Sequence, residues 1–205
     1  MSFNELKDIY NTNPEYFYIA IGVFVALCGL LWLIIKFVNK DAENKKIKKV
    51  IKNIGADFIQ NVAIPDGLDG FIFFDYMVLM PTGILVVDVQ NYNGYLFGGE
   101  TIDDWTQMIG RKSYKFKNPL PGNQHHVQSV KEHTGDVPVQ GRIVFTSVGE
   151  FPKDIPKGVS TTGSLKEDVS FSVVGNAVPE LFQQTWNKLL TIVKEANQQV
   201  SLQKR

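Results

Sequence analysis

The feature that most constrains this chain is an apolar run over residues 16–38. It holds no charged side chain before Lys36, and an α-helix needs roughly 20 apolar residues to cross the hydrocarbon core of a bilayer. The run therefore predicts one transmembrane helix. Residues 1–15 in front of it are acidic rather than basic, which favours an uncleaved membrane anchor over a cleaved signal peptide.

Lysines beside the apolar run predict its orientation, because positively charged flanks stay in the cytoplasm. Residues 1–15 hold one lysine, whereas residues 36–52 hold seven. We therefore expect a single-pass protein of the inner, cytoplasmic membrane, with a short extracytoplasmic N-terminus over residues 1–15 and a cytoplasmic domain over residues 39–205. The lipid bilayer is then a partner, and small residues in the span leave self-association through it open.

Charge is unevenly distributed along the chain. The formal net charge is zero overall, but it is +5 over residues 36–53 and −3 over residues 54–205. Proteins that bind nucleic acid tightly usually carry a basic surface, so this composition argues against strong unaided binding. The single cysteine, Cys28, lies inside the apolar run and excludes a disulfide framework and a cysteine-based metal site.

The soluble part is predicted to be α/β, with one mixed central sheet flanked by helices. Apolar runs bounded by proline and glycine turns predict strands, and helical spacing of apolar residues predicts helices. The expected strands are 57–64, 71–80, 84–90, 95–97, 113–117 and 141–146. The expected helices are 45–54, 123–132 and 178–199, the last after a segment rich in loops.

Two of these strands place a carboxylate in apolar surroundings. Asp75 follows the run 71–74, and Asp88 ends the run 84–87. Buried carboxylates are usually paired, hydrogen-bonded or bound to a cation. Their spacing around a turn fits neighbouring antiparallel strands, which would let both side chains hold one divalent metal. The alternative is that one of them faces solvent at a strand end and makes a turn hydrogen bond.

A basic stretch with interleaved aromatic residues is a second candidate site. It contains Arg111, Lys112, Tyr114, Lys115, Phe116 and Lys117. Such a pattern is typical of surfaces that follow a phosphate backbone and stack bases, but lysines that protect an exposed edge strand explain it equally well. The nearby pair His125 and His126 is more typical of a helix surface than of a metal site, because only His133 lies close to it in sequence.

A series of short motifs spans the soluble part: Ala42–Glu43, Gln60–Pro65, Phe74–Val78, Gly83–Gly94, Trp105, Asn118–Leu120 and Val144–Thr146. In this order they resemble the nuclease-related domain (NERD) family, and the resemblance is strongest over residues 42–146. It implies a restriction-endonuclease-like fold of the PD-(D/E)xK superfamily. An apolar anchor in front of the domain also resembles the membrane-tethered members.

The resemblance also implies roles for individual residues. Asp75, Asp88 and the Val89 carbonyl would hold Mg²⁺, with Mn²⁺ as an accepted substitute, and Glu43 and Gln90 would complete the catalytic set. Gln90 stands where the family has a lysine, so it is able to orient a water molecule but brings no positive charge. With the basic stretch added, the residues predicted to contact nucleic acid are Arg111, Lys112, Lys115 and Lys117 from that stretch, and Asn118, Gln124 and His126 from the family motifs.

These observations give one leading hypothesis and two alternatives. The leading one is a membrane-tethered, metal-dependent nuclease that hydrolyses phosphodiester bonds of DNA or RNA. The first alternative is a catalytically degraded module of the same fold that binds nucleic acid or a protein partner at the membrane. The second is a structural component of a membrane protein assembly. Asp75 and Asp88 favour the nuclease, whereas Gln90 and the low basicity favour the degraded module.

Overall fold

A computed structural model describes residues 14–68, 70–170 and 177–203. The chain divides into two compact units, Met1–Lys45 and Lys46–Arg205, and each is considered by itself. Apart from its last two residues, the predicted extracytoplasmic segment 1–15 lies outside the described residues.

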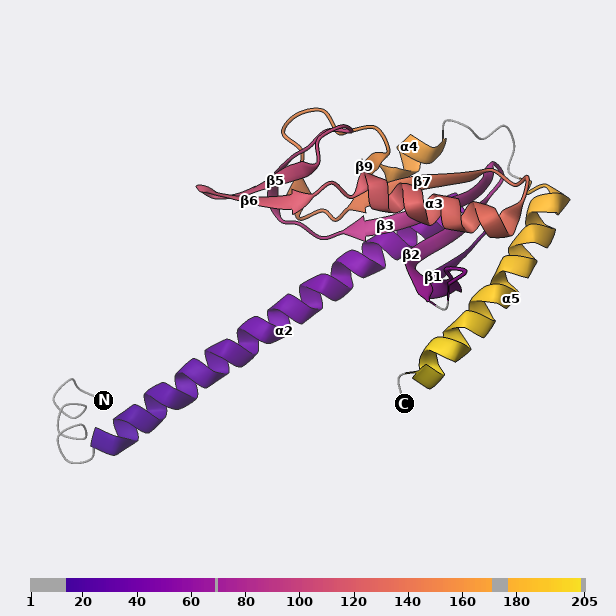
Figure 1. The fold of residues 1–205 in the computed structure, drawn as a ribbon. Helices are drawn as coiled ribbons and strands as arrows, with labels where there is room; N and C mark the ends of the chain where they lie inside the picture. Colours follow the sequence, from indigo (N-terminus) through magenta and orange to yellow (C-terminus); the bar gives the residue numbers. More distant parts are fainter. Residues whose placement is uncertain (1–13, 69, 171–176, 204–205) are drawn as a thin grey trace. The chain divides into compact units, whose positions relative to one another are not determined.

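Helix α2, Pro14–Ile54, is the first described element (Figure 1). Its window Tyr18–Ile35 is long and apolar enough to cross a membrane, and none of it is buried. The predicted span is thus helical and has the required composition, while its insertion and orientation stay predictions. Gly55 ends the helix, and its N–H donates to the Ile51 carbonyl at 3.1 Å, as is usual at a helix C-terminus.

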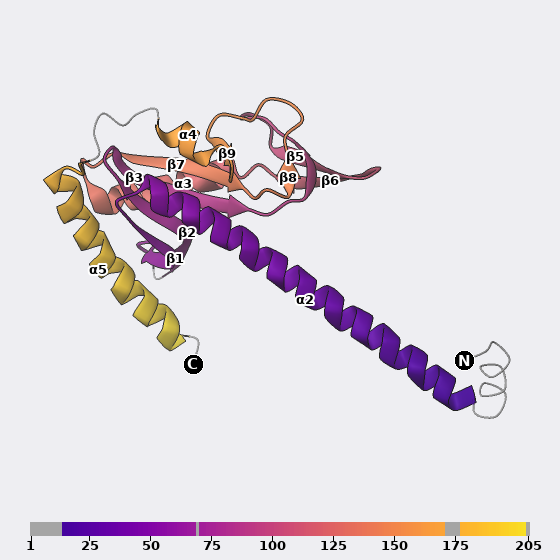
Figure 2. The same cartoon turned by 180° about the vertical axis from the view of Figure 1, so that it is seen from behind.

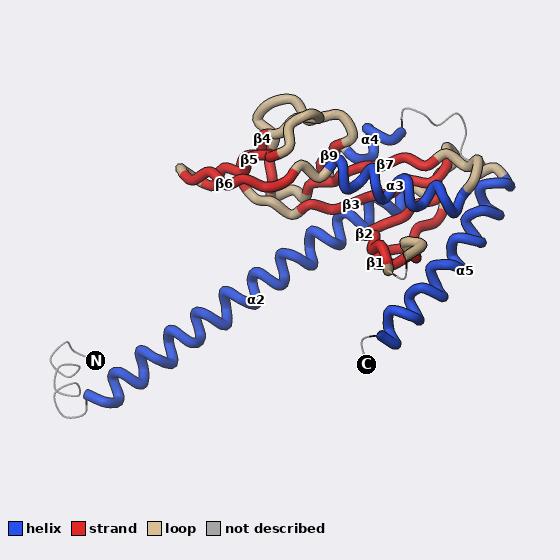
Figure 3. Tube along the Cα trace, in the orientation of Figure 1, coloured by secondary structure: helices blue, strands red, loops and turns tan. Residues whose placement is uncertain are grey.

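A five-stranded sheet with the order β1-β2-β3-β7-β9 forms the centre of the second unit (Figure 3). The strands are β1 Asp57–Pro65, β2 Phe71–Met80, β3 Gly83–Gln90, β7 Val139–Phe145 and β9 Val159–Thr161. The first three are antiparallel, and β7 and β9 continue the sheet in parallel with β3. Every residue of β3 from Gly83 to Asp88 is buried, which explains the unbroken apolar run in its sequence.

Helices cover both faces of this sheet (Figures 1 and 2). On one face α3, Leu120–Thr134, and α5, Glu180–Gln203, contribute Val130 and Trp186 to a core with Met77 and Val86. On the other face the end of α2 and the short α4, Leu165–Ser170, bury Ile47, Ile51 and Leu165 against β2 and β3. The predicted amphipathic helix 45–54 is therefore confirmed, since Ile47 and Ile51 are buried while Lys48 and Lys49 are exposed.

A second, four-stranded sheet has the order β6-β5-β4-β8. Its strands are β4 Gly94–Phe97, β5 Asp104–Ile109, β6 Lys112–Lys117 and β8 Gly149–Glu150. The prediction of one central sheet is therefore wrong. The segment after β3 leaves the central sheet, and the core beneath it is shared with β7 and β9. Trp105 of β5 stacks there on Phe145 of β7, with ring centroids 6.0 Å apart. Three strands and helix α4 were not predicted: β5, β8 and β9.

Candidate active site

Asp75 and Asp88 are brought together by the pairing of β2 with β3. The antiparallel register ends with Tyr76 opposite Val87, and its continuation sets Asp75 opposite Asp88 on the same face of the sheet. The Val89 N–H donates to Asp75 Oδ2 at 2.7 Å. The expectation of neighbouring antiparallel strands is confirmed, and each carboxylate has hydrogen-bond donors.

Asp88 is only 8% exposed, and helix α3 provides its partners. Asn123 Nδ2 donates to Asp88 Oδ2 at 2.8 Å. His126 Nδ1 lies 2.9 Å from both carboxylate oxygens, so the ring nitrogen donates a proton shared between them. Asn123 and His126 are three residues apart on one helix face. They tie α3 to the buried end of β3.

The close approach of α3 to the sheet depends on Gly141 in β7. A Cβ atom at this position would overlap Asn123 Oδ1 and would press on the Val127 side chain. The glycine thus makes room for the amide that holds Asp88. The structure brings Asn123 into the site although sequence reasoning assigned it no role. The available signal was the i, i+3 spacing of Asn123 and His126, which puts two polar side chains on the buried side of the helix.

The electrostatics of the site follow from burial and from these contacts. Burial raises the pKa of the Asp75 carboxyl, the Val89 N–H opposes this shift, and the neighbouring charge of Asp88 adds to it. The hydrogen bond to Asp88 raises the pKa of the His126 imidazole, and burial opposes that shift. The contact with Asp88 therefore favours the protonated form of the His126 imidazole.

The raised pKa of His126 predicts a pH-dependent contribution to stability. The His126–Asp88 contact should stabilise the fold fully below about pH 6.5, the ordinary histidine pKa, and lose this effect as pH rises through the higher pKa of the folded state. We expect the stability difference between wild type and His126→Gln to shrink as pH rises from about 6 to 9. Chemical denaturation of the full chain in detergent micelles measures it. A difference that stays constant over this range would contradict the assigned ion pair.

The donor set suits a hard cation more than a transition metal. No group of three or more His, Cys, Asp or Glu side chains within residues 14–68, 70–170 and 177–203 is arranged to hold a metal ion. Mg²⁺, however, is commonly held by one or two carboxylates together with waters and substrate phosphates. Each carboxylate has about four lone-pair positions, so the bonds to Asn123 and His126 leave Asp88 able to bind a cation as well. The residues present therefore fit Mg²⁺.

The other predicted catalytic residues lie on two different units. Gln90 follows Asp88 by two positions in β3 and so shares its side of the strand, and its carbonyl accepts the Thr146 N–H at 3.0 Å. Glu43 belongs to α2 in the first unit. Its place relative to Asp75 and Asp88 is not fixed, and its catalytic role stays a prediction.

The basic stretch forms the edge of the second sheet. Arg111 lies in the turn before β6, and Lys112, Lys115 and Lys117 lie on β6 itself, the outermost strand. Lys117 Nζ pairs with Asp104 Oδ1 at 2.8 Å. The predicted edge strand is confirmed, whereas nucleic-acid binding by these residues stays a prediction. Asn118 bonds to the Gly99 and Glu100 carbonyls at 3.4 and 3.2 Å, which holds the chain before α3.

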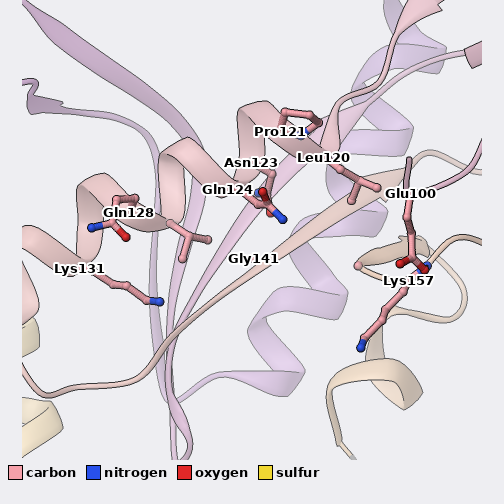
Figure 4. A pocket seen from close by; sticks show the side chains of 11 residues that line it. Glu100, Leu120, Pro121, Asn123, Gln124, Gln128, Lys131, Gly141 and Lys157 are labelled. Carbon is pink, nitrogen blue, oxygen red and sulfur yellow. The ribbon is translucent and has the colours of Figure 1, made fainter. Parts of the chain in front are cut away.

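A groove of about 620 Å³ runs beside α3 (Figure 4). Asn123 lines it, so the groove begins next to the residue that holds Asp88. The predicted contact residue Gln124 is exposed and also lines it, together with two cations, Lys131 and Lys157. The two lysines come from α3 and from the loop before β9, and no sequence pattern pointed to their common groove.

Comparison with known proteins identifies one family. The sequence pattern of the nuclease-related domain, NERD, matches residues 39–146, which is more than half of the chain. The chain belongs to the NERD family. The NERD match includes Asp75, Asp88, Gln90, Asn123 and His126.

This NERD protein is 29% identical over 93 residues to an uncharacterized protein of Bacillus anthracis. The aligned part covers 44% of each chain, so the two proteins share less than half of their lengths. No solved structure matches the chain.

Proposed function

We propose that this NERD protein is a membrane-tethered, metal-dependent nuclease that hydrolyses phosphodiester bonds of DNA or RNA. The observation that carries the proposal is the placement of Asp75 opposite Asp88 on adjacent strands, with both carboxylates held by hydrogen bonds. A mixed sheet flanked by helices supports membership of the PD-(D/E)xK superfamily with its restriction-endonuclease-like fold.

In this proposal Asp75, Asp88 and the Val89 carbonyl hold Mg²⁺ or Mn²⁺. A bound Mg²⁺ would polarise a phosphoryl oxygen and lower the pKa of a water molecule. The chain itself orients the two carboxylates: the Val89 N–H fixes Asp75, while Asn123 and His126 fix Asp88. The Gln90 amide orients the attacking water. Attack at phosphorus then breaks one phosphorus–oxygen ester bond of the nucleic-acid backbone.

Nucleic acid is proposed to reach the carboxylates along the groove beside α3. Lys131 and Lys157 bring two positive charges to this groove against one carboxylate, Glu100. Gln124 and Gln128 add amide groups to the lining. Backbone phosphates are the groups that such side chains bind without reading sequence. The edge strand β6, together with Arg111 in the turn before it, forms a second surface that binds backbone phosphates of the same nucleic acid.

Cleavage of labelled single- and double-stranded DNA and RNA by the full chain in detergent micelles tests the roles of Asp75 and Asp88. Asp75→Asn and Asp88→Asn should each lower the Mg²⁺-dependent rate by about 100-fold or more, because loss of even an outer partner of a metal ligand costs about 10–100-fold. Asn123→Ala should lower the cleavage rate by about 10–100-fold, because Asn123 is an outer partner that holds Asp88. Isothermal titration of Mg²⁺ should show weaker binding in both aspartate variants.

Asp136→Asn is the matched control for this experiment. Asp136 is an exposed carboxylate in the turn after α3, so its variant should cleave like wild type. Equal rates in wild type and both site variants would show that Asp75 and Asp88 do not carry the reaction. Complete absence of Mg²⁺ binding in the wild-type protein would reject the metal site.

Gln90→Lys separates the nuclease from the catalytically degraded module. A lysine here would add a positive charge next to the attacking oxygen, and we expect cleavage to rise about tenfold or more. Wild-type protein that binds oligonucleotides without cleavage, together with a Gln90→Lys variant that cleaves, would favour the degraded module. A lower rate in Gln90→Lys than in an active wild type would show that the amide itself is needed.

Membrane tethering rests on the Tyr18–Ile35 window of α2. We expect the full chain to stay with membranes after alkaline carbonate washing. Protease should digest the domain in inside-out vesicles but not in intact spheroplasts, since the lysines at 36–52 keep that flank inside. Release by carbonate would contradict the tether, and digestion in spheroplasts would reverse the orientation. Crosslinking in the same membranes would reveal self-association or a protein assembly.

A further inference from the structure

Arg142 in β7 is a cation without a matching anion. Its neighbour Gly141 faces Asn123 of α3, and consecutive side chains of a strand point to opposite faces, so Arg142 lies on the face away from α3. Its Nε atom is buried and has no hydrogen-bond partner among the described residues. Its Nη2 donates to the Asp168 carbonyl at a long 3.4 Å. A guanidinium cannot lose its proton, so this charge needs a further partner.

The carboxylate of Asp168, which lines the same hollow as Arg142, is already engaged by hydroxyl groups. Asp168 Oδ2 accepts the Ser160 hydroxyl at 2.6 Å and the Ser164 hydroxyl at 2.8 Å. Arg142 forms no ion pair with any residue in the described part of the chain. Two hydroxyl donors thus hold the negative charge of Asp168, and the arginine remains available to an external anion.

Arg142 and Asp168 line a hollow of about 330 Å³ together with Lys157 and Ser164. The backbone of Lys157 is anchored, because its N–H donates to Glu100 Oε1 at 3.1 Å, and its exposed side chain lies at the rim. Figure 4 shows Lys157 beside Glu100. With two cations and one carboxylate, the side chains around the hollow carry a net positive charge.

We propose that this hollow binds a phosphate group, as inorganic phosphate or as a phosphate monoester. The planar fork of arginine matches two oxygens of a phosphate, and Lys157, which lines the same hollow, adds a point charge. The volume is near the lower end of ligand sites, which suits a phosphate with a small attached group. Arg142 lies on the other face of the sheet from Asp88, while Lys157 also lines the groove beside α3. Phosphate binding here does not depend on the proposed nuclease activity.

Titration of inorganic phosphate into the full chain in detergent micelles at constant chloride tests this site. Wild type should bind phosphate, and Arg142→Gln should weaken binding about tenfold or more, as expected for loss of a charge-assisted hydrogen bond. Lys157→Gln should weaken it several-fold. Lys188→Gln, which removes an exposed cation from α5, is the matched control and should bind like wild type.

One further variant controls for misfolding, and two further ligands identify the source of the phosphate. Arg142→Lys keeps the charge without the fork, so intermediate affinity supports the site even where Arg142→Gln melts early by circular dichroism. A 5′-mononucleotide that displaces inorganic phosphate indicates a small free ligand. A 5′-phosphorylated oligonucleotide that binds tighter than its unphosphorylated form, but only with Arg142 present, indicates a nucleic-acid end. Two results would overturn the proposal: no phosphate binding by wild type at about 10 mM phosphate, or equal weakening of binding by Lys188→Gln.

Discussion

The Asp88 carboxylate is buried at the end of the central strand, and leaving it there without partners would cost several kcal/mol. Helix α3 supplies those partners from a single turn, Asn123 and His126. Because both donors must reach the same two oxygens, they fix the register of α3 along β3. They also require Gly141 in β7, where a side chain would displace Asn123. Strand, helix and neighbouring strand are thus positioned by one charged group.

The central strands could be predicted from sequence because much of their length is buried on both faces. Strand β3 and the second half of β2 are apolar runs bounded by turns, and β7 ends in the apolar run 143–145. Strand β5 was missed because only Trp105 is fully buried in it, which gives no alternation over its length. Strands β8 and β9 have two and three residues, too few for any period to appear. Their existence depends on pairing partners far along the chain.

The second sheet escaped prediction for a similar reason. Gly94 adopts φ of 83° and lies so close to the Met108 carbonyl that a Cβ would overlap it. At this contact the chain leaves the central sheet after β3 and begins the second sheet. A sequence shows the glycine but not the strand that will approach it. The aromatic residues of this region then pack on one another, with Tyr92 stacked on Phe116 at 4.1 Å between ring centroids.

The residues of the candidate site also differ in whether sequence alone could predict them. Asp75 and Asp88 are visible in sequence because a charge inside an apolar strand is costly. The role of Asn123 could not be predicted in the same way, because its contact with Asp88 depends on how α3 packs against the sheet. Gln90 is uncharged, whereas a lysine in its place would add a positive charge beside Asp75 and Asp88. In the proposed nuclease this charge would weaken the attraction of the site for a divalent cation but would stabilise a hydroxide. A cation on Asp88 and the proton on His126 would also oppose each other, because both are stabilised by the same carboxylate. Metal binding and hydrolysis are thus separable in this proposal, and one can be retained where the other is weakened.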